Sequence, residues 1–181
     1  MAKVHHSSLP STSQEHLTFG WADQKELADR IAVFFSAHAD SSYISHSELQ
    51  SGRAIAPGQW HPDLVQIIRA EAEEILQQHA SDAPRKSIAC AWLKNELVGI
   101  AFVSFAQQNT EKFATLDDLI VAPTVRGVGL GKQFIDWIAF SVKSFGNKRL
   151  FLESGKNNTK AHHFFEKMGF ELTSVVMMRD L

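Results

Sequence analysis

The feature that restricts the fold most is a glycine cluster between a strand pattern and a helix pattern. The stretch VRGVGLGKQF, residues 125–134, places three glycines within five positions. The residues before it, ATLDDLIV, have the apolar and β-branched character of a strand, and helical spacing follows it at Phe134, Ile135, Ile138 and Val142. Glycines let the backbone adopt positive φ and approach a ligand closely. Such a turn at a helix start can hold phosphate, because the first amides of the helix point outward along its dipole.

Two common glycine-rich loops do not fit this stretch. The dinucleotide-binding form needs a six-residue glycine spacing followed by an acidic strand end, which the chain does not offer. In a P-loop, the Lys132 that follows Gly131 would precede a Ser or Thr for magnesium, but Gln133 stands there. The sequence therefore predicts an anion-binding turn of another class. A glycine turn that serves packing alone is the alternative.

Strand and helix patterns alternate along the chain. Strands are expected at 15–22, 87–93, 97–106, 114–121, 148–154 and 170–181, and helices at 23–38, 61–80, 131–146 and 158–168. Asp23 is the expected cap of the first helix, and residues 39–60 are expected to be loop-rich. This order predicts an α/β fold with a mixed, mostly antiparallel sheet flanked by helices on both faces. We expect one domain, residues 15–181, after a disordered polar tail, residues 1–14.

Composition and charge exclude several classes of partner. The net charge of −2 predicts neither nucleic acid nor an anionic membrane as a partner, and no apolar run approaches the roughly 20 residues that span a bilayer. Cys90 is the only cysteine, which predicts no intrachain disulfide, no cysteine metal cluster and a cytoplasmic setting. Residues 126–167 hold eight Lys or Arg against three Asp or Glu, whereas the remainder holds ten against seventeen. This asymmetry predicts a local anion site, with uneven surface charge as the alternative.

Two motifs in this order resemble the GCN5-related N-acetyltransferase (GNAT) superfamily. Arg126, Gly129 and Gly131 match its acetyl-CoA signature Arg/Gln-x-x-Gly-x-Gly/Ala, and NTKAHHFFEKMGF resembles its Asn-x-x-Ala…Tyr…Gly-Phe segment. The resemblance implies an acetyl-CoA-dependent N-acetyltransferase that transfers an acetyl group to a primary amine of a small molecule or protein by direct attack on the thioester. A catalytically silent acyl-CoA-binding sensor or scaffold is the alternative.

Carried over by position, the resemblance implies a cofactor site made by three segments. The backbone of residues 119–121 would pair with the pantetheine arm as an added strand, and the amides of residues 126–132 would hold the pyrophosphate. Asn158 would bond the pantetheine, with Ala161 and Phe164 packing against the cofactor. The implied cofactor-binding residues are Leu119, Ile120, Val121, Arg126, Gly127, Val128, Gly129, Leu130, Gly131, Lys132, Asn158, Ala161, Phe164 and Phe165.

The resemblance also implies candidates for catalysis. An attacking amine must lose a proton, commonly through water. The base falls at the first acid of such a pair, so Asp117 is the candidate and Asp118 the spare, on opposite sides of the strand; two surface acids are the alternative. Phe165 stands where much of the family has a tyrosine that protonates the leaving thiolate. Tyr43, the only tyrosine, could supply a hydroxyl instead, with simple packing as the alternative.

The acceptor is expected to bind against residues 39–60 and the final hairpin. Asp40 and Glu48 in that segment could attract a cationic amine, or be ordinary surface acids. The resemblance implies no metal, and it allows a homodimer formed through the last strands.

Overall fold

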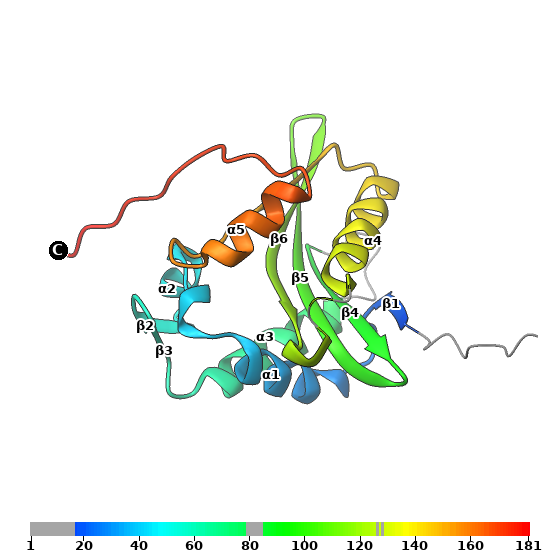
Figure 1. Ribbon diagram of the computed structural model, residues 1–181, viewed down its shortest axis with the longest axis horizontal. Coiled ribbons are helices and arrows are strands. Elements are labelled where there is room, and N and C mark those ends of the chain that lie inside the picture. The colour runs from blue at the N-terminus through cyan, green and yellow to red at the C-terminus, as the bar shows by residue number, and fades with distance from the viewer. Residues whose placement is uncertain (1–16, 79–84, 126, 128) are drawn as a thin grey trace, which may run out of the picture.

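The core of the molecule is a five-stranded sheet in the order β1-β4-β5-β6-β7 (Figure 1). The structure, a computed structural model, describes residues 17–78, 85–125, 127 and 129–181. The strands are β1 Leu17–Trp21, β4 Lys86–Leu93, β5 Glu96–Gln108, β6 Glu111–Val121 and β7 Arg149–Leu152. Neighbours run antiparallel except β6 and β7, which run parallel. The mixed, mostly antiparallel sheet is therefore confirmed, whereas the tail predicted at 1–14 lies outside the described residues.

Helices cover both faces of this sheet, as expected (Figure 1). On one face lie α1 (Leu27–His38) and α3 (Leu64–Gln78), and on the other α4 (Leu130–Ser144) and α5 (Thr159–Lys167). Alternate residues of β5 supply the two cores: Ile100 and Phe102 pack toward α1 and α3, whereas Ala101 and Val103 pack toward α4. The alternation of β5 thus places one strand in both hydrophobic cores.

The segment expected to be loop-rich contains short regular elements. A 3₁₀ turn, η1 (Ser41–Tyr43), precedes α2 (His46–Gln50), and β2 (Ala54–Ala56) pairs with β3 (Gln59–Trp60). Ser45 and Glu48 form a capping box at the start of α2, a Ser-x-x-Glu signal that predicts a helix start.

The cap expected for α1 is wrong, because Glu26 occupies the N-cap position instead of Asp23.

The closing strand predicted at 170–181 is wrong. After α5 the described chain has no regular element, and the C-terminal segment, residues 171–181, runs away from the body (Figure 1). Leu172, Val175 and Met177 are exposed by 87%, 77% and 92%. A β-branched pattern becomes a strand only where an edge supplies its pairing, and this segment leaves the sheet instead. The final hairpin expected to border the acceptor is therefore absent from the described chain.

Candidate active site

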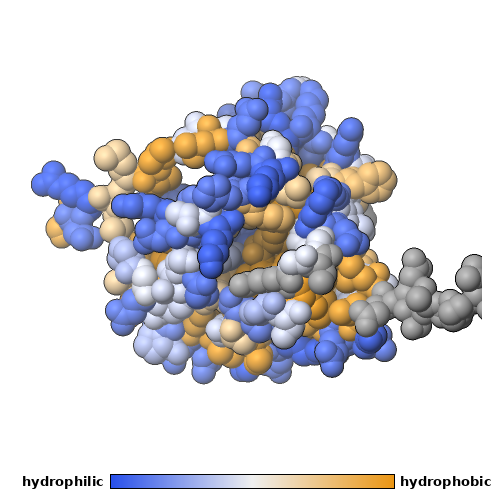
Figure 2. Space-filling model, viewed as in Figure 1, coloured by the Kyte–Doolittle hydropathy of each residue, from blue (hydrophilic) through white to orange (hydrophobic). Residues whose placement is uncertain are grey.

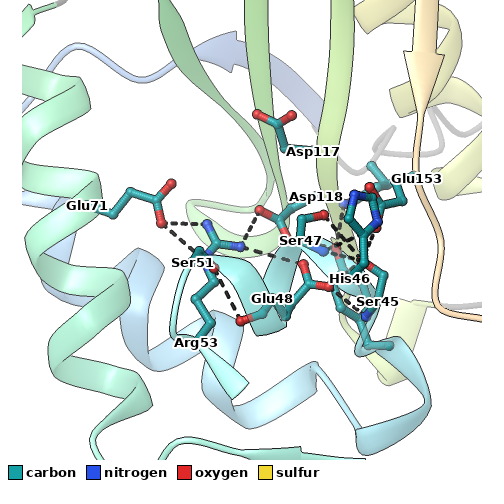
Figure 3. A network of polar contacts seen from close by, with 12 residues as sticks. Ser45, His46, Ser47, Glu48, Ser51, Arg53, Glu71, Asp117, Asp118 and Glu153 are labelled. Carbon is teal, nitrogen blue, oxygen red and sulfur yellow. Dashed lines mark hydrogen bonds and ion pairs between the residues drawn. The ribbon is translucent and has the colours of Figure 1, made fainter. Parts of the chain in front are cut away.

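A bulge in β6 places Asp117 outside the regular strand pairing. Asp118 lies opposite Phe102 and Leu116 opposite Val103, so the register shifts by one residue at Asp117. A bulged residue has no partner across the ladder and redirects its side chain. The expectation that Asp117 and Asp118 face opposite sides of the strand assumes regular alternation of side chains, and the bulge interrupts that alternation. In Figure 3 the Asp117 carboxylate points away from Arg53, whereas the Asp118 carboxylate points toward it.

Next to the bulge, β6 and β7 separate. Their parallel pairing joins Phe113–Leu116 to Arg149–Leu152 and ends there. The space beside the rest of β6 is a hollow that is partly open to solvent, which we call the β6–α5 hollow. Its walls come from η1 and α2, β6, the end of β7 with the loop after it, and α5. They consist of Tyr43, Ser45, Glu48, Leu116, Asp117, Leu119, Leu152, Glu153, Ser154, Asn158, Ala161 and Phe165.

The hollow brings together six residues that the sequence singled out as site residues. They are Tyr43, Asp117, Leu119, Asn158, Ala161 and Phe165. Figure 2 shows the middle of this face hollowed, with hydrophobic side chains inside and hydrophilic ones around the rim. Such a site, apolar with a few converging polar groups, is the usual form of a small-molecule pocket.

Asp117 is a carboxyl group tuned toward neutral pH. It is half-buried and accepts a hydrogen bond from the Ser104 hydroxyl. Burial raises its pKa to about 6, although the Ser104 hydrogen bond and the charge of Lys86 act in the opposite direction. A carboxylate with such a pKa can take and release a proton under physiological conditions.

Asp118 is placed differently. It is 1% exposed, and its Oδ2 accepts a hydrogen bond from Arg53 Nη1 at 2.9 Å. Its Oδ1 accepts one from the Tyr43 hydroxyl at 3.0 Å. Burial raises the pKa of Asp118, and the contact with Arg53 opposes that shift. Asp118 does not line the hollow, so the spare base of the sequence prediction belongs to a buried ion pair.

Tyr43 bridges the buried pair and the hollow. Its oxygen donates to Asp118 and accepts from the backbone N–H of Leu119, both at 3.0 Å. Its ring lies edge-on to Phe35, with the centroids 6.0 Å apart. Burial and the charge of Asp118 raise the pKa of the Tyr43 phenol well above 10, its ordinary value. Tyr43 therefore holds its proton at neutral pH.

The loop that carries Tyr43 packs tightly on Gly155, which follows β7. A Cβ at Gly155 would lie 2.6–2.8 Å from the carbonyl oxygens of Ser42, Tyr43 and Ile44. Only a glycine permits this close approach without displacing the backbone. Gly155 thus allows the backbone at Tyr43 to pack directly on the chain that follows β7. Nothing in the sequence around Gly155 indicated this role.

A polar network continues outward from Arg53 (Figure 3). Arg53 is 6% exposed, and its Nε and Nη2 donate to Glu71 Oε2 at 3.0 and 2.5 Å. Lys86 Nζ donates to the other oxygen of Glu71 at 3.1 Å. Glu48 lies 4.0 Å from Arg53. One buried guanidinium therefore balances carboxylates from α2, α3 and β6.

A second group of contacts closes the α2 side of the hollow. Ser45 donates from its backbone N–H to Glu48 Oε2 at 2.7 Å and from its hydroxyl to Glu153. His46 Nδ1 lies 2.6 Å from Glu153 Oε1. Arg53, Glu71 and Glu153 were not among the residues predicted from the sequence. Arg53 lies in a segment without periodicity and Glu71 on a helix face where acids are normally solvated. The Ser-x-x-Glu pattern of the capping box is a sequence signal that could have located this cluster.

The glycine turn has the conformation that its composition predicts. Gly127 and Gly129 have φ of 83° and 81°, and Gly129 is the N-cap of α4. Gly131 comes close to α5, because a Cβ there would lie 3.4 Å from the Phe164 ring. Lys132 pairs with Asp136 one turn along α4, so its ammonium group is engaged on the helix surface. Arg126 and Val128, also predicted here, lie outside the described residues.

The residues that the structure describes contain no group of three or more His, Cys, Asp or Glu side chains arranged to hold a metal ion. Each of their helices is too short or too polar to cross a membrane.

A family model decides the family of this chain. The model of the acetyltransferase (GNAT) family matches residues 53–170. The chain belongs to the GNAT family. The match begins at Arg53 and includes β6, the glycine turn and α5, so the hollow described above lies largely inside it.

Individual GNAT relatives are similar over parts of the chain. A streptothricin acetyltransferase of Streptomyces lavendulae is 32% identical over 49% of this chain and 46% of its own length. The chain thus spans about half of that relative. An uncharacterized N-acetyltransferase of Bacillus subtilis is 23% identical over 77% of this chain and 91% of its own. Among solved structures, an aminoglycoside N-acetyltransferase in complex with CoA superposes with a TM-score of 0.67 at 17% identity, covering 96% of this chain and 99% of its own.

Proposed function

We propose that this protein is an acetyl-CoA-dependent N-acetyltransferase that acetylates a primary amine of a small molecule or a protein. The observation that carries this proposal is the place of Asp117: a half-buried carboxyl group with a pKa of about 6, at a bulge that lines the β6–α5 hollow. Membership of the GNAT family supports the reaction class. The similar fold of an N-acetyltransferase bound to CoA supports acetyl-CoA as co-substrate.

The residues present suit the cofactor. β6 continues past its pairing with β7, so the backbone of Leu119, Ile120 and Val121 is proposed to pair with the pantetheine arm. The pyrophosphate is proposed to lie on the amides from Arg126 to Lys132, where positive φ and a helix start favour an anion. Asn158, Ala161, Phe164 and Phe165 are proposed to bind the arm from the α5 side, three of them lining the hollow.

In the proposed reaction, Asp117 removes the proton that keeps the acceptor amine cationic, directly or through water. The neutral nitrogen attacks the thioester carbonyl, the new C–N bond forms, and the C–S bond breaks with the electron pair leaving on sulfur. The second amine proton is lost and the thiolate gains one. Asp118 is unsuited to the first step because it is buried and held by Arg53.

Tyr43 is proposed to supply the hydroxyl that Phe165 lacks. Phe165 is buried against Phe164 and Phe170 and has no proton to donate. Tyr43 lies on the wall of the same hollow. The Tyr43 proton points to Asp118, so a hydrogen bond to the developing charge on sulfur requires the hydroxyl to turn from Asp118 toward the hollow. Because the pKa of Tyr43 is raised, it is a weak acid, and we assign it that hydrogen bond rather than a complete proton transfer.

The acceptor is proposed to be cationic. Glu48, Glu153 and Asp117 line the hollow, and Arg53 balances Glu48 only at 4.0 Å. Carboxylates in a confined site attract an ammonium group. Relatives named for streptothricin and for aminoglycosides make compounds of these classes the first to test. Asp40 is not part of this set, because it caps η1 through Ser42.

A silent acyl-CoA-binding module is the second candidate, and Phe165 at the family's tyrosine position is the observation that favours it. The deciding experiment measures thiol release from acetyl-CoA with streptothricin, aminoglycosides, polyamines and short peptides, together with acetyl-CoA binding by calorimetry. Acceptor-dependent release that Asp117→Asn abolishes supports the enzyme. Binding of acetyl-CoA without release for any acceptor supports the silent module.

Two further proposals concern assembly and cellular location. We propose a homodimer formed through the C-terminal segment, because Leu172, Val175, Val176, Met177 and Met178 are exposed and β7 is an edge strand. We also propose a cytoplasmic location, because the sequence has a single cysteine, Cys90, which is buried and can form no disulfide within the chain.

A further inference from the structure

The direction of the Tyr43 hydroxyl proton follows from its two partners. The Leu119 N–H can only donate, so the Tyr43 oxygen must accept there. The proton of Tyr43 must therefore point to Asp118 Oδ1, which lies 3.0 Å away. That arrangement requires an unprotonated Oδ1, because a proton on Oδ1 would occupy the position between the two oxygens that the phenol proton takes.

Arg53 is the group that most favours the ionised form of Asp118. Asp118 is 1% exposed, and burial together with the charge of Glu48 favours its neutral form. Arg53 opposes both through its hydrogen bond to Oδ2 at 2.9 Å. The remaining charges near the pair are Glu71 on α3, Lys86 on β4 and Asp117 on β6, and none of these contacts Asp118 in the described structure.

Arg53 is itself held in one orientation. Glu71 receives two of its N–H groups, and its guanidinium lies 5.3 and 5.5 Å from the ring centroids of Phe35 and Phe102. A planar fork with fixed donors can address Glu71 and Asp118 together, which a lysine cannot do. The Tyr43 end is fixed as well, through its ring contact with Phe35 and its backbone contact with Gly155.

We propose that Arg53 is a positioning residue that acts through Asp118 to hold the Tyr43 hydroxyl on the Leu119 amide, at the β6 edge beside Asp117. This inference rests on the proposed function for its catalytic consequence, but not for its structural content. Tyr43 is then presented to the hollow in one hydrogen-bonded state, and the Leu119 N–H stays occupied until a ligand displaces the hydroxyl.

The test uses the fact that Tyr43 is the only tyrosine of the chain. The full-length protein labelled with ¹³Cζ-tyrosine gives a single phenolic resonance, which responds to the hydrogen bond that the hydroxyl donates. At pH 7 we expect Arg53→Met to move this resonance to the position found in Asp118→Asn. Arg53→Lys should leave it nearer the wild-type position, because a charge still faces Asp118. Arg149→Met is the matched control, since Arg149 pairs with Glu111 on the surface. It should not move the resonance.

Kinetics supply the second readout. Arg53→Met should lower kcat by about the same factor as Tyr43→Phe, on the order of 10-fold to 100-fold, and the double variant should lose no more than either alone. The KM for acetyl-CoA should change less than about 3-fold in each. Additive losses in the double variant would overturn the proposal, and so would a wild-type resonance in folded Arg53→Met.

Two outcomes separate this inference from the proposed function. If Arg53→Met does not fold, the Asp118→Asn variant decides instead, because Arg53 keeps its contacts with Glu71 there. A lowered pKa of the Tyr43 phenol in Asp118→Asn supports the proposal, and an unchanged pKa refutes it. If the wild type acetylates nothing, the proposed function fails, yet the resonance still decides whether Arg53 holds Tyr43.

Discussion

Asp117 and Asp118 are consecutive in the chain, but only the carboxylate of Asp117 lines the β6–α5 hollow. Asp118 is buried and bound by Arg53 and Tyr43. The bulge in β6 separates the two environments, since it removes Asp117 from the pairing that Asp118 keeps. Two like residues thereby receive different chemical tasks, one open to exchange protons and one committed to a buried ion pair.

The first prediction concerns the pH dependence of activity. A base must be deprotonated to act, so the rate should rise with pH through about 6, the pKa of Asp117. Asp117→Asn should lower kcat by about 10²-fold to 10⁴-fold and remove this acidic limb. Initial rates between pH 5 and 8 check both. A variant that keeps the limb would assign it to another group.

The second prediction concerns stability at the same residue. The pKa of Asp117 is raised from 3.8 to about 6 on folding, so the ionised form costs stability above pH 6, and this cost disappears only well below 3.8, where the carboxyl group is protonated in both states. Asp117→Asn should therefore stabilise the protein by about 1–3 kcal/mol at pH 8 and leave it nearly unchanged at about pH 3. Urea unfolding at the two pH values measures the difference, and an equal effect at both would contradict the assignment.

The third prediction concerns the glycine turn. Gly129 has φ of 81° at the N-cap of α4, and an L-residue there costs about 1–2 kcal/mol. Gly129→Val should weaken acetyl-CoA binding by at least about 10-fold, because the turn can no longer present its amides. Gly146→Val is the matched control, with φ of 86° just after the other end of α4. Calorimetry should show wild-type affinity in the control; equal losses in both variants would point to the fold and not to the turn.

The fourth prediction concerns Gly155. Its Cβ position lies 2.6 Å from the Ser42 carbonyl oxygen, so Gly155→Ala must displace the loop that carries Tyr43. We expect a loss of about 1–3 kcal/mol in unfolding free energy and a lower kcat. Gly20→Ala on β1, where a Cβ meets nothing within 4 Å, should change neither. Thermal unfolding with initial rates checks the pair, and an unchanged rate in Gly155→Ala would separate Tyr43 from that loop.

The fifth prediction concerns assembly. Deleting residues 171–181 removes the exposed apolar side chains of the C-terminal segment. If they pair two copies, the full chain should sediment as a dimer and the shortened chain as a monomer. Sedimentation equilibrium distinguishes the two, and a monomeric full chain would end the dimer proposal.

The sequence predicted the fold well where a periodic pattern coincided with burial. β5 and α4 have clear periods, and each places its apolar residues in a core. The strand pattern at 170–181 failed because β propensity needs a neighbouring edge, which the sequence cannot supply. The short elements within 39–60 were missed because each is too brief for a period to show.

The candidate site divides in the same way. Asp117, Asn158 and Ala161 were named from motifs, and the structure brings them together in one hollow. Arg53 and Glu71 lie 18 positions apart and meet through tertiary packing, which no local pattern encodes. The bulge that separates Asp117 from Asp118 depends on the register between β5 and β6, so it was equally invisible in the sequence.

The short pairing between β6 and β7 has a mechanical consequence. Four residue pairs join β7 to the remainder of the sheet, and the strands part beyond them. The β6–β7 pair is therefore joined at one end and open at the other. A ligand that paired with β6 as an added strand would continue the sheet into the open end, so binding at this site should also make β7 more rigid.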